Sequence, residues 1–217
     1  SGIAYGNDYL PGYHGSLRYS GGLKFDYIIV HETGHEWWGN SITTNDIADM
    51  WIHEGFCTYS EALYVECIYG YNQMLDYINN QKKFIRNDSP ITGNYHVNQQ
   101  GSSDMYHKAS VMLHTLRTLI EDDNLWFDIL NNISEKFKYQ TIDAQDIMNY
   151  IMHMTGYDLN EFFAQYLYHK DIPEFQYKLQ KSGREITLIY RWNAIDNFDM
   201  PVLINTGGKD SWIYPKL

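Results

Sequence analysis

The 217-residue sequence has only two cysteines, no long apolar run and a shortage of basic residues. Cys57 and Cys67 fall in a segment whose pattern predicts a single helix, so their Cα atoms would lie about 15 Å apart, too far for a disulfide. No apolar run approaches the length of a membrane span, so we expect no transmembrane helix. Residues 1–6 show no signal-peptide pattern, and the compartment stays open.

Lys and Arg number 16 against 27 for Asp and Glu, which gives a net charge of −11. The basic residues do not cluster in a way that could follow a phosphate backbone, so we expect no nucleic-acid partner. The acidic balance is compatible with a cationic peptide N-terminus as ligand, although such a balance more often only keeps a protein soluble. With 44% hydrophobic residues, the chain can build one sizeable core and a small second domain.

The stretch His31-Glu32-Thr33-Gly34-His35 carries the strongest chemical signal. On a helix, residues four apart share a face, so His31 and His35 can present both imidazoles to one cation, while Glu32 faces the open side of that cation. Chance can also place two histidines four apart, so the pattern needs a third ligand. Glu54 is the candidate, because eighteen residues separate it from His35 and leave room for a second helix to return.

These residues, with Gly39-Asn40 and the segment Trp51–Phe56, resemble the aminopeptidase N family, which also contains leukotriene hydrolase. The resemblance covers residues 24–170 and implies a gluzincin metallopeptidase that acts on peptides with a free N-terminus. It implies one Zn²⁺ whose ligands are His31, His35 and Glu54. It also implies that Glu32 is the general base.

Two positions depart from the family pattern. His53 stands where the family usually has Asn, but a residue next to Glu54 on a helix points away from the metal. Tyr106-His107-Lys108-Ala109 is similar to the family's Tyr-x-Lys-Gly segment, with Ala109 in place of Gly. The resemblance implies that Tyr106 stabilises the transition state.

Two further carboxylates, Asp49 and Glu61, flank Glu54 on the second predicted helix. Either could accept the outer N–H of a ligand histidine, which is the supporting contact that metal sites need. The alternative for each is a solvated helix carboxylate. The family often has Asp at the position of Asp49.

Hydrophobic periodicity predicts a mainly helical first part, with a loop and at most one short strand over residues 1–23 and another loop over 87–101. Helices are expected over residues 24–40, 46–69, 72–86, 103–120, 125–138, 143–154 and 159–169. Helix caps are expected at Asn45 or Asp46, at Ser102 or Ser103, and at Thr141.

After Pro173 the pattern alternates with a period of two, which predicts antiparallel strands over Phe175–Gln180, Glu185–Trp192 and Pro201–Asn205. The expected class is therefore α+β. The resemblance implies a thermolysin-like zincin catalytic domain over residues 1–171 and the incomplete start of a β-sandwich domain over 172–217.

The family usually holds the substrate's ammonium group through a Gly-x-Met-Glu-Asn segment upstream of the metal helix, and this chain has none. The resemblance therefore implies that an N-terminal domain and the anchor precede Ser1, and we expect the chain as given to bind zinc but to be a poor aminopeptidase. Two other functions stay open: a leukotriene-type epoxide hydrolase with the same zinc, and a non-catalytic zinc-containing peptide-binding module. Glu32 argues against the second, because a structural zinc site does not need a base.

Overall fold

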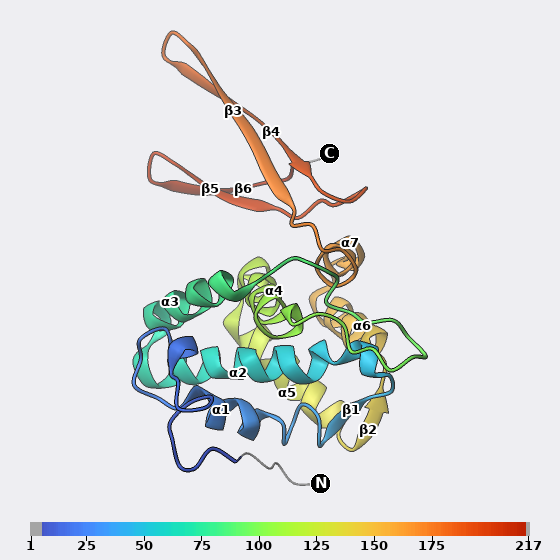
Figure 1. Cartoon of the computed structure of the whole chain (residues 1–217). Coiled ribbons are helices and arrows are strands. Elements are labelled where there is room, and N and C mark those ends of the chain that lie inside the picture. The colour runs from blue at the N-terminus through green and yellow to red at the C-terminus, as the bar shows by residue number, and fades with distance from the viewer. Residues whose placement is uncertain (1–5, 216–217) are drawn as a thin grey trace.

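The computed structural model describes residues 6–215, which form a helical body with two β-hairpins at its C-terminal end (Figure 1). The helices are α1 (Tyr27–Gly34), α2 (Trp51–Tyr69), α3 (Tyr71–Gln81), α4 (Asp104–Ile120), α5 (Asp123–Lys136), α6 (Ala144–Thr155) and α7 (Asn160–Phe163), the last continued by a π-helical turn (Ala164–Tyr168). Short 3-10 helices cover Arg18–Ser20, Ile47–Asp49 and Lys82–Phe84. The prediction of a mainly helical α+β fold is confirmed.

Helix α1 is shorter than the predicted range of residues 24–40. It ends at Gly34, and beyond it the backbone N–H of Asn40 bonds the carbonyl of His35, five residues back. Gly34 and Gly39 are poor helix formers, and Gly39 has a φ of 138° that a helix does not accommodate. The chain thus turns away just after His35.

The turn after α1 leads into β1 (Ile42–Thr44), which pairs in parallel with β2 (Gln140–Ile142). Neither strand was predicted, because three residues are too few to show a period. For the predicted loop over residues 1–23, the described part contains a 3-10 helix and no strand, while residues 1–5 lie outside the described range.

Two helix starts test the predicted caps. The side chain of Asp46 accepts a hydrogen bond from the N–H of Ala48 and opens the 3-10 helix that leads into α2. Before α6, the cap is Asp143, which forms a capping box with Asp146, and not Thr141, which lies in β2. Asp143 is the cap because it is the residue directly before the first turn of α6.

Helices α2 and α4 form the centre of the core, and the predicted apolar stripe of α4 is buried except at its far end, where Leu119 is only partly covered. The buried guanidinium of Arg117 on α4 bonds the carboxylates of Glu66 on α2 and Asp123 on α5. Three helices are therefore joined by one charge network. Among residues 6–215, no helix is long and apolar enough to cross a membrane.

The C-terminal strands form two separate antiparallel hairpins: β3 (Glu174–Ser182) with β4 (Glu185–Asn193), and β5 (Val202–Thr206) with β6 (Lys209–Ile213). The antiparallel prediction is confirmed, but the strands do not join into one sheet. Figure 1 shows both hairpins standing off the helical body. Hydrogen bonds from Ile195 to Gln165 and from Trp212 to Glu121 connect them to it.

Helices α2 and α4 approach closely at Gly55, next to the predicted ligand Glu54. A Cβ at Gly55 would lie 2.6 Å from the Cβ of Ala109 and 3.1 Å from the carbonyl oxygen of Met105, so no larger residue fits without movement. Ala109 is the residue that replaces the glycine of the family pattern. Gly55 supplies the space that the Ala109 methyl group occupies.

We predict that Gly55→Ala lowers the free energy of unfolding by about 1–2 kcal/mol, because overpacking costs about 1–3 kcal/mol and exceeds the helix propensity that alanine gains. Ala109→Gly in the same chain should recover most of this loss. The double-mutant cycle, measured by urea denaturation, would contradict the contact if the two effects simply added.

Candidate active site

The predicted ligands converge where the end of α1 meets α2. The Nε2 atom of His31 lies 3.0 Å from Oε2 of Glu54, and Nε2 of His35 lies 3.5 Å from the same oxygen. One ligand atom from each of the three residues falls within 4.8 Å of the others. The helices can approach this closely because Gly34 faces Cys57, where a Cβ would lie 3.2 Å from the sulfur.

The outer nitrogens of both rings are already bonded. Nδ1 of His31 lies 2.9 Å from Oε1 of Glu61, and Nδ1 of His35 lies 3.0 Å from the carbonyl oxygen of Trp38. A carboxylate and a carbonyl only accept, so each Nδ1 carries the hydrogen and each Nε2 keeps a lone pair. Both lone pairs then face an oxygen of Glu54, which also accepts only. A cation between them removes this conflict, and two imidazoles with one carboxylate are a donor set that fits zinc.

Without a metal, protons on the two histidines supply the positive charge. Burial opposes the charged form of His31, but its hydrogen bonds to Glu54 and Glu61 outweigh burial and raise the pKa of His31 to about 10. Burial likewise opposes the charged form of His35, but the hydrogen bond to Glu54 helps to outweigh burial, and the pKa of His35 is raised. The pKa of Glu54, which burial alone would raise, is lowered to about 2 by the two histidines. The site therefore attracts positive charge strongly.

The ligands open into a cleft of about 760 Å³ that also contains Glu32, Glu61 and Tyr106. Glu32 is half-buried on the same cleft wall as His31. The ring of Tyr106 lies 6.0 Å from the ring of His31. Burial, followed by the charges of Glu54 and Glu32, raises the pKa of Tyr106, so its phenol keeps its proton and can donate a hydrogen bond.

Glu61 and Asp49, the two predicted supporting carboxylates, have different surroundings. Glu61 is buried between His31 and the hydroxyl of Tyr77, which also donates to it, and burial raises the pKa of Glu61. Asp49 lies elsewhere: it accepts hydrogen bonds from the hydroxyl of Tyr95 and from the N–H of Ala144. In the described part of the chain it bonds neither ligand histidine, because it lies in the 3-10 helix before α2 and its carboxylate faces the N-terminus of α6.

Three residues near the ligands were not identified from the sequence: Trp38, Tyr77 and Cys57. The Cys57 sulfur lies 3.2 Å from Nδ1 of His35, behind the ligand ring. Trp38 contributes its backbone carbonyl, which has no sequence signature. Tyr77 is one of twenty tyrosines in the chain, so its sequence context does not single it out. Both cysteines are free thiols, Cys57 buried and Cys67 exposed. His53 turns away from the ligands, and its Nε2 accepts from the N–H of Thr44.

Comparison with known proteins places this chain in a family. The Peptidase family M1 domain matches residues 20–166, more than half of the chain. A leucyl aminopeptidase of Saccharolobus solfataricus is 23% identical over 199 residues, which are 84% of this chain and 25% of that protein. The human aminopeptidase RNPEPL1 is 27% identical over 135 residues, 56% of this chain and 19% of that protein. The chain thus spans at most about a quarter of the length of these two relatives.

Solved structures show the same fold. A Legionella pneumophila aminopeptidase A, in complex with aspartic acid, superposes with a TM-score of 0.62 at 15% identity, over 87% of this chain and 23% of that one. An M1 zinc metallopeptidase from Deinococcus radiodurans superposes with a TM-score of 0.59 at 20% identity, over 70% of this chain and 35% of that one.

We predict that Glu61→Gln weakens zinc affinity about 10- to 100-fold, since it removes the charge that orients His31 and makes it a better ligand. Asp49→Asn is the matched control: it should leave zinc affinity unchanged while lowering the free energy of unfolding by about 1–3 kcal/mol, because buried hydrogen bonds are disturbed. Competition with a chromogenic chelator measures the first quantity and denaturant titration the second. Equal losses of zinc affinity in the two variants would refute the assignment.

Proposed function

The chain belongs to peptidase family M1, and on this basis we propose that it is a zinc-dependent aminopeptidase that cleaves the first bond of peptides with a free N-terminus. The observation that carries the proposal is the convergence of His31, His35 and Glu54 on one point of a cleft that also contains Glu32 and Tyr106. The names of the relatives, which are aminopeptidases, support the same activity.

His31, His35 and Glu54 would hold the zinc ion. Bound there, zinc supplies a Lewis acid that lowers the pKa of water toward neutrality and polarises a carbonyl group. Glu32 borders the same cleft, follows the ligand His31 directly and bonds none of the three ligands, so its carboxylate is available to accept a proton from water. It then returns the proton to the departing amine. The phenol of Tyr106 donates a hydrogen bond to the oxygen that gains negative charge at the carbonyl.

We also propose that residues 1–171 form the catalytic domain and that residues 172–217 begin a β-sandwich domain. The family match ends at residue 166, and the strands after it stand apart from the helices (Figure 1). Exposed apolar side chains on the first hairpin, including Tyr177, Leu179 and Ile186, are typical of strands that other strands cover.

We predict that Glu32→Gln retains zinc but loses most of the hydrolysis of aminoacyl anilides, because a proton acceptor is removed and no ligand is changed. The measurement combines zinc content with release of the reporter from a panel of aminoacyl substrates, with and without chelator. Loss of zinc by this variant would mean that Glu32 is a ligand. An absence of zinc-dependent hydrolysis, both in this chain and in a chain extended upstream, would exclude the proposed activity.

We predict that Tyr106→Phe lowers kcat about 10²–10³-fold and changes KM much less, because its hydrogen bond strengthens mainly in the transition state. Steady-state kinetics of the zinc-loaded protein test this expectation. Tyr19→Phe is a suitable control with an aminoacyl anilide, which has no carboxylate, since Tyr19 lines the same cleft but its hydroxyl bonds the guanidinium of Arg18. An unchanged kcat for Tyr106→Phe would give Tyr106 a packing role only.

A further inference from the structure

The cleft has a cationic wall as well as the acidic metal site. Arg18, Lys83 and Arg86 all line it, although the whole chain carries a net charge of −11. Within residues 6–215, none of the three forms an ion pair with a carboxylate. Arg18 donates a hydrogen bond to the hydroxyl of Tyr19, and Lys83 donates one to the amide oxygen of Asn80. These partners are neutral, so the positive charges remain available to a ligand in the cleft.

This cationic wall is built on fixed positions. The guanidinium of Arg18 lies 4.4 Å from the ring centroid of Tyr19, and that ring packs against Phe84 at 4.6 Å and against His107 at 5.2 Å. His107 follows Tyr106 in the first turn of α4. The wall is thus connected through an aromatic cluster to the residue that we place beside the reacting carbonyl.

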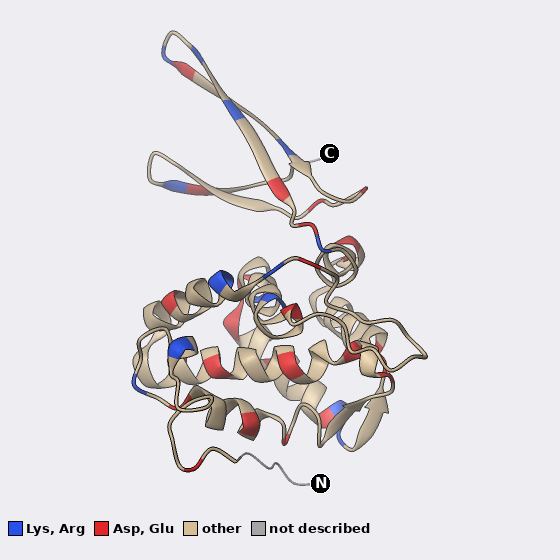
Figure 2. Cartoon of the chain, in the orientation of Figure 1, with Lys and Arg blue, Asp and Glu red and all other residues tan. Residues whose placement is uncertain are grey.

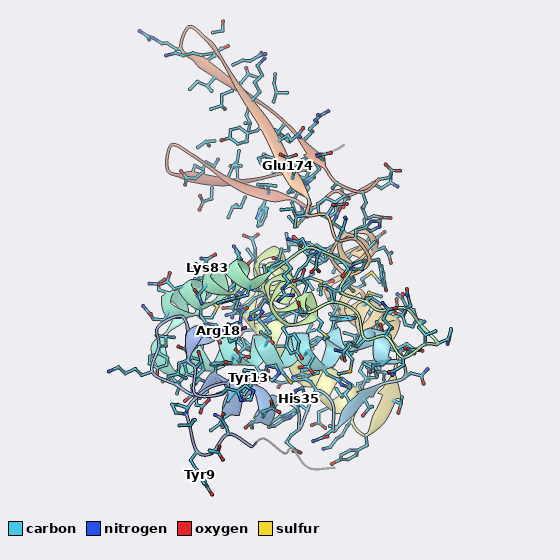
Figure 3. The ribbon with its side chains drawn as sticks, in the orientation of Figure 1. Tyr9, Tyr13, Arg18, His35, Lys83 and Glu174 are labelled. Atoms are coloured by element: carbon cyan, nitrogen blue, oxygen red, sulfur yellow. The ribbon has the colours of Figure 1, made fainter. Side chains whose placement is uncertain are left out.

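Arg86 is anchored at the same helix end. The buried carboxylate of Asp104, the first residue of α4, accepts hydrogen bonds of 2.8 Å from the backbone N–H of Arg86 and 2.7 Å from that of Asn87. This holds the backbone of Arg86 next to the turn that carries Tyr106. Figure 2 shows red acidic segments on the ribbons of α1 and α2. In the view of Figure 3, Arg18 and Lys83 lie on one side of the helical body, and Tyr13, another cleft residue, lies between Arg18 and His35.

We propose that Arg18, Lys83 and Arg86 bind a carboxylate on the leaving-group portion of the peptide and so make the enzyme selective for short or acidic peptides. The inference rests on the proposed function. A cationic wall repels the free ammonium group of the substrate, so it must face the part of the peptide that lies beyond the scissile bond. In a dipeptide or tripeptide that part ends in the α-carboxylate, and in longer peptides an acidic side chain offers the same group.

The preference for a carboxylate should decrease as the peptide becomes longer and as the salt concentration rises. Each extended residue moves the α-carboxylate about 3.5 Å further from the scissile bond, so longer neutral peptides carry it past the wall. The three cations are exposed, so the interaction should weaken as ionic strength rises.

The test measures binding to the zinc-loaded Glu32→Gln chain, in which the peptides stay intact. Three probes are compared by calorimetry: Ala-Ala-Ala, its C-terminal amide, and the amide of Ala-Glu-Ala. We expect the free acid to bind about tenfold more tightly than its amide. Tighter binding of the Ala-Glu-Ala amide than of the Ala-Ala-Ala amide identifies the acidic side chain as a second source of the carboxylate.

Variants then assign the effect to the wall. Arg18→Gln, Lys83→Gln and Arg86→Gln should each reduce the ratio of affinities between acid and amide, and together they should abolish it. Lys82→Gln is the matched control, because it removes the same charge from the same 3-10 helix. Both lysines bond an asparagine of α3, Lys82 to Asn79 and Lys83 to Asn80, but Lys82 does not line the cleft. The control should leave the ratio unchanged.

Two outcomes overturn the inference: equal affinities for all three probes, or an acid preference that survives in the triple variant, which would show that the carboxylate binds the metal instead. Hydrolysis of alanyl anilide by the unmodified zinc-loaded chain tests the proposed function separately, because this substrate has no carboxylate. Hydrolysis without a preference for the free acid rejects only the proposed role of the cationic wall. An acid preference without hydrolysis, both in this chain and in a chain extended upstream, rejects the aminopeptidase activity alone.

Discussion

Two imidazole nitrogens and a carboxylate oxygen face one another at the junction of α1 and α2, and this arrangement needs positive charge between them, either a metal ion or protons on the histidines. The rest of the helical body maintains this arrangement. Gly34 lets α1 approach α2 at Cys57, and Gly55 lets α2 approach α4 at Ala109. Glu61 and the carbonyl of Trp38 fix the outer nitrogens of the two histidines, so the inner nitrogens cannot turn away.

Much of this arrangement could be predicted because it depends on local spacing. Helix periodicity decides which faces of α2 and α4 are buried, and the spacing of His31, His35 and Glu54 needs only two adjacent helices. Asp49 shows the limit of such reasoning. It lies only five residues before Glu54, yet its carboxylate bonds Tyr95 and Ala144, which are 46 and 95 residues away in sequence. Long-range partners of this kind leave no pattern in one sequence.

The features that could not be predicted from the sequence are short elements or depend on tertiary contacts. Strands β1 and β2 have three residues each and are held by pairing across nearly a hundred residues. Helix α1 ends early because, after Gly34, backbone hydrogen bonds join residues that are five apart in place of the helical four. The cationic wall is equally non-local, since Arg18 and Lys83 line one cleft and their sequence neighbours Tyr19 and Phe84 pack on each other. The proposed substrate selectivity, unlike the predicted metal site, thus depends on residues that sequence spacing does not connect.

The central claim is that His31, His35 and Glu54 bind one zinc ion, and zinc X-ray absorption spectroscopy of the loaded protein tests it most directly. Because the Cys57 sulfur lies behind His35, the spectrum also distinguishes two donor sets. The account predicts one zinc per chain with nitrogen and oxygen ligands at about 2.0–2.2 Å and no sulfur. A zinc–sulfur distance of about 2.3 Å, or a protein that takes up no zinc, would contradict it.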